Sequence, residues 1–89
     1  MRQPEYSGQF KRDLKRIKKR GQDMNKIKIA MQLLIEEKRL PASYGNHPLA
    51  GNWRGSYDLH VEPDWLLIYR ITGETVRFER TGSHSDLFR

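Results

Sequence analysis

Apolar side chains recur at helical spacing in the first part of the chain. Phe10, Leu14 and Ile17 stand at positions i, i+4 and i+7, with Ser7 placed to cap the first turn and Gly21 to end the last. This pattern predicts a short amphipathic helix over residues 7–21.

A second apolar stripe follows Asp23 and predicts a second helix, which ends at residues 38–41. Its members are Met24, Ile27, Met31 and Leu34, widened by Ala30, Leu33 and Ile35. Stripes of this kind usually face a core, so we assign this helix no chemistry.

From Trp53 onward the pattern is that of strands, with β-branched and aromatic residues over 57–61, 65–72 and 75–78 or slightly beyond. Turn residues at 63–64 and 73–74 favour an antiparallel meander, and residues 4–6 are suited to add a strand. We therefore expect one α+β domain over residues 1–89, with two N-terminal helices packed on a curved antiparallel sheet of about four strands.

The charge balance favours a polyanionic partner. Lys and Arg number 17 against 11 Asp and Glu, which gives a net charge of +6 and a pI near 9.9. The basic segments lack the apolar face of a membrane-surface helix, so nucleic acid or an acidic protein is favoured. We expect a cytosolic protein, because no run approaches about 20 apolar residues, residues 1–4 lack a signal-peptide pattern and cysteine is absent.

The polar face of the first predicted helix carries most of this charge. Like charges at i,i+4 spacing repel each other, so a phosphate-binding surface explains the cluster better than helix stability does. A merely solvated face is the alternative. The cluster consists of Lys11, Arg12, Lys15, Arg16, Lys18, Lys19 and Arg20.

All three histidines, His47, His60 and His84, fall outside the predicted helices, in or beside turns and strand ends. A single histidine there is usually structural, but three together suggest a site. Imidazole titrates near pH 6.5 and serves as general base or acid, each role contributing roughly 10²- to 10⁴-fold. Cleavage of RNA by its own 2′-hydroxyl needs both roles.

Such a reaction also needs positive charge around the phosphorus, and Arg80 is suited to supply it through its planar fork. Arg80 lies two residues beyond Phe78, so we expect both side chains on the same sheet face if the strand continues. The alternative is a structural bridge from Arg80 to Glu79 or Asp64.

Metal ligation is a rival use of the histidines together with Asp58, Glu62 and Asp64. We expect no metal and no cofactor, because no helical pair of ligating histidines is present. A serine hydrolase is disfavoured, since no serine has a nucleophile-elbow context.

Two aromatic residues are candidates for stacking on bases, an interaction worth about 1–3 kcal/mol per base. Trp65 suits a core equally well. For Phe88, next to the last residue, a substrate or partner role is favoured.

Several motifs together resemble the YafQ family of bacterial toxins, in the RelE/ParE superfamily of type II toxin–antitoxin systems. The resemblance covers essentially the whole chain and includes the N-terminal segments 5–8 and 23–26. It rests chiefly on His47-Pro48-Leu49, Gly51-x-Trp53-x-Gly55, Asp58-x-His60-Val61-Glu62-Pro63-Asp64-Trp65, Leu67-Ile68-Tyr69 and Arg77-Phe78-Glu79-Arg80-Thr81-Gly82-Ser83-His84.

This resemblance implies a RelE-like fold and an endoribonuclease that cleaves translated mRNA in the ribosomal A site. It implies a DinJ-like antitoxin partner and contact with operator DNA only through that antitoxin. The implied functional positions are His47, His60, Asp64, Trp65, Arg80, His84 and Phe88.

In this interpretation His84 is one proton-transfer partner, and His60, held near Asp64, competes with His47 for the other role. Arg80 stabilises charge, and Trp65 and Phe88 position the nucleotide. Ribosomal RNA phosphates bind Lys11, Lys15, Arg16 and Lys19. Two other functions stay open at this point, a ParE-like inhibitor of gyrase and a nucleic-acid-binding module without catalysis.

Overall fold

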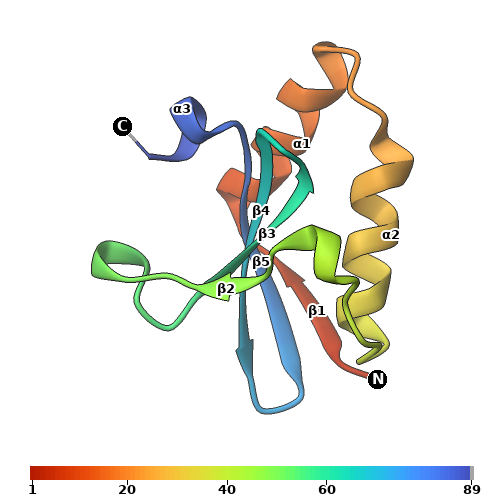
Figure 1. Cartoon of the computed structure of the whole chain (residues 1–89), viewed down its shortest axis with the longest axis vertical. Helices are drawn as coiled ribbons and strands as arrows, with labels where there is room; N and C mark the ends of the chain where they lie inside the picture. Colours follow the sequence, from red (N-terminus) through yellow and green to blue (C-terminus); the bar gives the residue numbers. More distant parts are fainter. Residues whose placement is uncertain (89) are drawn as a thin grey trace.

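The computed structural model describes residues 1–88 and shows two long helices, one short helix and a five-stranded sheet (Figure 1). The helices are α1 (Gly8–Lys19), α2 (Met24–Ile35) and α3 (His84–Leu87). The strands are β1 (Gln3–Tyr6), β2 (His47–Pro48), β3 (Tyr57–Glu62), β4 (Trp65–Thr72) and β5 (Thr75–Gly82). Among these described residues, no helix has the length and apolar character needed to cross a bilayer.

Both predicted helix starts are confirmed. The Ser7 hydroxyl accepts a hydrogen bond from the Phe10 backbone, and the Asp23 carboxylate accepts one from the backbone of Asn25. Helix α2 ends earlier than predicted, at Ile35. It ends there because Glu37 turns to a left-handed φ of 59°, and Lys38 N then donates back to Leu33 O across the final turn.

The strand order is β1-β5-β4-β3-β2, so the expected α+β architecture is confirmed with one strand more than anticipated. Strands β2 to β5 pair antiparallel, whereas β1 pairs parallel to β5, which makes the sheet mixed rather than purely antiparallel. The parallel pairing is possible because the helices carry the chain back between these two strands. As a result, α1 starts beside residues 78–79 of β5, where Ser7 contacts the carbonyls of Phe78 and Glu79.

Each face of the sheet buries its own apolar cluster. Helices α1 and α2 cover one face, and α3 with the 49–53 loop covers part of the other (Figure 1). The large cluster is formed by Phe10, Ile17, Ile27, Ala30, Leu34, Leu59, Trp65, Leu67, Tyr69, Val76 and Phe78. The small one is formed by Leu66, Ile68 and Leu87, with Leu49 and Trp53 packed against it.

A β-bulge in β5 decides where Arg80 lies. Tyr69 pairs with Phe78, but the preceding residue of β4, Ile68, pairs with Arg80. Glu79 is therefore the extra residue of β5. Cross-strand partners point to the same face, which places Arg80 with Ile68 on the face opposite Phe78. The expectation that Arg80 and Phe78 share a face is therefore wrong, because it assumed an unbroken strand.

Candidate functional site

The strand register gathers three of the predicted site residues, His47, His60 and Arg80, on the sheet face opposite α1 and α2. One transverse row runs from His47 through Asp58 and Ile68 to Arg80, and the next row contains His60. The ring centroids of His47 and His60 are 6.5 Å apart, and those of His60 and His84 are 5.9 Å apart. Imidazoles from three separate segments thus converge on one surface.

His47 is held by the short connection that precedes it. Gly45, in a left-handed conformation with φ 56°, turns its carbonyl so that it lies 3.0 Å from His47 Nδ1. The neighbouring Asn46 accepts a hydrogen bond from the Tyr69 hydroxyl at 2.6 Å. Burial raises the pKa of Tyr69 to about 12, so this hydroxyl remains a donor at neutral pH.

His84 is held by Asp64 through two contacts. The Asp64 carboxylate lies 2.9 Å from the His84 backbone nitrogen and 2.6 Å from its ring Nδ1. The bond from the His84 backbone, followed by the ring contact, lowers the pKa of Asp64. An ionised Asp64 at neutral pH accepts the Nδ1 hydrogen and fixes the ring orientation.

All three rings share one arrangement. Nδ1 faces an oxygen in each case, the carbonyl of Gly45 for His47, the carbonyl of Pro63 at 3.2 Å for His60, and Asp64 for His84. Because these oxygens only accept hydrogen bonds, the hydrogen of a neutral ring belongs on Nδ1. Nε2 is then the nitrogen that exchanges protons with a substrate.

Asp58 lies beneath the histidines and was not among the predicted catalytic residues. It is buried, and its Oδ1 lies 3.0 Å from His47 Nδ1 without a hydrogen bond, since the hydrogen bond of that nitrogen is with the carbonyl of Gly45. Burial raises the pKa of Asp58, and the three histidines oppose that rise. The sequence does carry a signal for Asp58, because it stands two residues before His60 and therefore faces the same side of β3.

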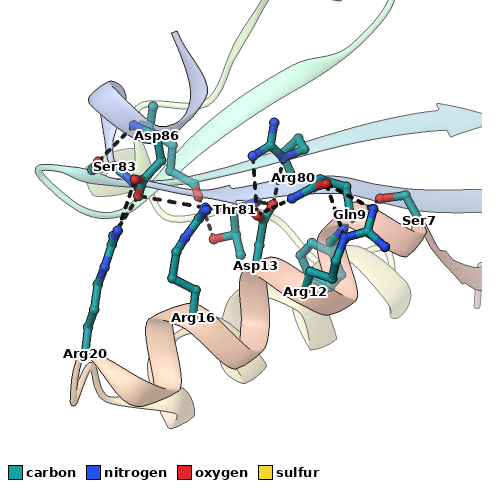
Figure 2. Close-up of polar contacts among 12 residues, drawn as sticks. Ser7, Gln9, Arg12, Asp13, Arg16, Arg20, Arg80, Thr81, Ser83 and Asp86 are labelled. Atoms are coloured by element: carbon teal, nitrogen blue, oxygen red, sulfur yellow. Dashed lines mark hydrogen bonds and ion pairs between the residues drawn. The ribbon is translucent and has the colours of Figure 1, made fainter. Parts of the chain in front are cut away.

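Arg80 bridges neither Glu79 nor Asp64 with its guanidinium, which pairs instead with Asp13 of α1 at 2.7 Å (Figure 2). Sequence reasoning missed this partner. It gave no reason to expect an acidic residue of α1 beneath β5.

Trp65 was predicted to position a nucleotide, and the structure contradicts this. Its side chain is 1% exposed, and the indole N–H donates to the Thr81 hydroxyl at 2.9 Å inside the core. A ring enclosed in this way cannot stack on a base. Phe88, in contrast, is 39% exposed, with its ring 6.3 Å from that of His84.

The predicted basic surface on α1 is present but divided. Lys11, Lys15 and Lys19 are exposed, whereas Arg16 donates to the buried Asp13 at 2.9 Å. A shallow groove of about 430 Å³ runs along this face. It is lined by Arg12, Lys15, Arg16, Lys19 and Arg20.

A wider cleft of about 610 Å³ opens beside His60. Its lining includes Tyr44, Glu62, Pro63 and Lys26, whose ammonium pairs with Glu62 at 2.8 Å. Within residues 1–88, no three histidine, aspartate or glutamate side chains are grouped as a metal site would require.

Comparison with known proteins identifies the class first. The fold matches the crystal structure of YafQ from E. coli strain BL21(DE3), with a TM-score of 0.95, 53% identity and all of both chains covered. It also matches a crystal structure of the E. coli DinJ–YafQ complex, with a TM-score of 0.94, 54% identity and all of both chains covered. These matches place the chain among toxins of this fold.

The sequence identifies the family. Residues 2–89 match the family described as the bacterial toxin of type II toxin–antitoxin system, YafQ, and the chain belongs to that family. It is 56% identical over 85 residues to the mRNA interferase toxin YafQ of Escherichia coli (strain K12), covering 94% of this chain and 92% of the relative.

Proposed function

We propose that this chain is a toxin that cleaves mRNA on translating ribosomes, by attack of a 2′-hydroxyl with histidine acid–base catalysis and without a metal. The observation that carries the proposal is the convergence of three imidazoles, each with Nδ1 against an oxygen, on the sheet face that also carries Arg80. The name of the 56%-identical relative, an mRNA interferase, supports mRNA as the substrate.

In the proposed reaction, one Nε2 takes the proton of the 2′-hydroxyl as O2′ forms a bond to phosphorus. The bond from phosphorus to the 5′-oxygen breaks, and a protonated imidazole gives that oxygen a proton. The products are a 2′,3′-cyclic phosphate and a free 5′-hydroxyl. His84 takes one role, and His60 or His47 takes the other.

Other groups around the histidines support binding and charge stabilisation. Arg80 neutralises the phosphorane, Phe88 stacks on a base and the cleft beside His60 accommodates a neighbouring nucleotide. The exposed Lys11, Lys15 and Lys19 bind ribosomal RNA phosphates.

We also propose a DinJ-like antitoxin as the cognate partner. The support is the DinJ–YafQ complex, whose toxin chain superposes on all of this one at 54% identity. Contact with operator DNA would then be made through the antitoxin.

The test is cleavage of a defined mRNA on programmed ribosomes by the purified chain, with and without chelator. We expect fragments ending in 2′,3′-cyclic phosphate or 3′-phosphate at equal rates in both. Cleavage that stops in chelator would contradict the metal-free mechanism. Growth arrest that persists with a His84→Ala variant would instead favour a toxin that does not cleave RNA.

A further inference from the structure

Asp13 is a charged residue in an unusual place. It lies in the middle of α1, and its side chain is 0% exposed, packed between that helix and β5 (Figure 2). A buried carboxylate is costly unless it is paired and fully hydrogen-bonded. Asp13 meets that condition with donors at 2.7–3.3 Å from Gln9, Arg16, Arg80 and the backbone of Thr81.

The geometry of the Arg80 contact leaves part of its guanidinium free. Asp13 receives Nε–H at 2.7 Å and Nη2–H at 3.3 Å, which together form one edge of the fork. A guanidinium has five N–H donors in a rigid plane, so the Nη1–Nη2 edge keeps donors for a second anion. Asp13 therefore fixes the orientation of the guanidinium and leaves the Nη1–Nη2 edge available to bind a phosphate.

The same carboxylate anchors the segment that leads to His84. Thr81 N donates to Asp13 Oδ2 at 3.1 Å, and the Thr81 hydroxyl donates to Leu66 O at 2.7 Å. Three residues later, His84 begins α3. The position of that helix is thus set against α1 as well as against the sheet.

Helix α1 is itself fastened to β5 beside Asp13. The Ser7 hydroxyl donates to the carbonyl of Glu79, the bulge residue, at 2.6 Å. At the other end of α1, Arg20 pairs with Asp86 of α3 at 2.7 Å. Asp13 therefore occupies a fixed point between the two contacts that hold β5 and α3.

We infer that Asp13 is a positioning residue for RNA cleavage: it orients the Arg80 guanidinium toward the scissile phosphate and sets the segment that carries His84. This inference rests on the proposed function, since it takes Arg80 and His84 to act on the substrate. Asp13 itself lies in the interior and touches no substrate.

The test is a double-mutant cycle of Asp13→Asn and Arg80→Ala, measured as single-turnover cleavage on programmed ribosomes with toxin in excess. We expect Asp13→Asn to slow cleavage about tenfold to hundredfold, the size of effect that a misplaced catalytic group produces, with ribosome affinity unchanged. In the Arg80→Ala background the same substitution should slow cleavage by a clearly smaller factor, because one of its two targets is gone and only its effect on the segment that carries His84 remains. Gln9→Ala, which removes a neutral donor to Asp13, is the matched control and should cleave normally.

The outcomes separate the two levels of the account. Effects of Asp13→Asn and Arg80→Ala that multiply independently, or a fully active Asp13→Asn, would overturn the positioning role alone. A fully active Arg80→Ala would instead refute the role given to Arg80 in the proposed function.

A second measurement needs no Asp13 variant, in case that substitution prevents folding. In the wild-type chain the Arg80 Nε–H resonance, identified by its loss in Arg80→Ala, should exchange slowly with solvent. It should stay protected when a 2′-deoxy dinucleotide is added, while the Nη signals shift. Rapid exchange of Nε–H in the free protein would overturn the inference.

Discussion

The two faces of the sheet are built from different kinds of residues. The face under α1 and α2 buries a continuous apolar cluster that includes Phe10, Leu67 and Phe78. The opposite face buries a smaller apolar cluster of Leu66, Ile68 and Leu87, and beside it lie histidine and arginine side chains and the buried Asp58. The first face forms a stable core, whereas the second keeps its histidine side chains within reach of solvent.

This difference teaches that stability and chemistry are separated by the thickness of one sheet. Substitutions on the helix-covered face should mainly change the free energy of unfolding, whereas those on the histidine face should mainly change the cleavage rate. The exposed fractions support this, since the His47 and His84 side chains are 54% and 53% exposed. Asp13 connects the two faces, because it lies on α1, which covers the first face, and accepts a hydrogen bond from Arg80, which belongs to the second.

The largest expected effect is that of His84→Ala. Removing a general acid or base should slow cleavage about 10²- to 10⁴-fold. The temperature of unfolding should change little, because the ring is half exposed and its removal opens no cavity. Cleavage on programmed ribosomes and thermal unfolding measure the two quantities. A variant that unfolds at a clearly lower temperature would show that the histidine face also contributes to stability.

The next effect compares two aromatic side chains. Trp65→Leu should lower the free energy of unfolding by about 2–4 kcal/mol, because it removes a buried ring and its bond to Thr81. Phe88→Ala should leave unfolding nearly unchanged and weaken substrate binding by about 1–3 kcal/mol. Urea unfolding and cleavage titrations measure both quantities. A Trp65→Leu variant that keeps its stability but binds substrate weakly would show that Trp65 contacts the substrate after all.

A smaller effect concerns the lysines of α1. Replacing Lys11, Lys15 and Lys19 together by Ala should weaken ribosome binding about tenfold at moderate salt and flatten its salt dependence. Arg16 is left in place because it pairs with Asp13. An unchanged salt slope would remove this face from the binding surface.

The smallest effect is a change of stability with pH at α3. Bonds from Arg20, and then from Ser83, lower the pKa of Asp86, whose ordinary value is 3.8. A carboxylate with a lowered pKa stabilises the fold at pH values above its ordinary pKa. This contribution is lost as the pH falls from the ordinary pKa toward the lowered one. Asp86→Asn should therefore cost about 1 kcal/mol at pH 7 and progressively less below about pH 4, as urea unfolding at each pH would show. An equal cost at both ends of the range would assign the loss to packing instead.

Local patterns allowed much of the fold to be predicted. The caps at Ser7 and Asp23 and the apolar spacing of α1 and α2 act within a few residues, so the sequence displays them directly. The meander of β3, β4 and β5 was equally visible from its turns. These are the features in which each residue's neighbours along the chain determine its conformation.

The features that could not be predicted depend on distant pairs. Strand β1 pairs with β5 across more than seventy positions, and the bulge at Glu79 depends on the register of β4. Trp65 is buried because β4 lies in the middle of the sheet, where both faces are covered. The burial of Asp13 follows from the same arrangement, since α1 lies against β5 because β1, which leads into α1, pairs with that strand.

The most direct test of the central claim uses an mRNA in which the nucleotide 5′ to the mapped cleavage site carries 2′-hydrogen in place of 2′-hydroxyl. If the histidine face promotes attack by that hydroxyl, the wild-type chain should bind the programmed ribosome normally and leave the modified linkage intact, while the unmodified message is cut. Cleavage of the modified linkage at an undiminished rate would contradict the account, because the nucleophile would then have to be another group.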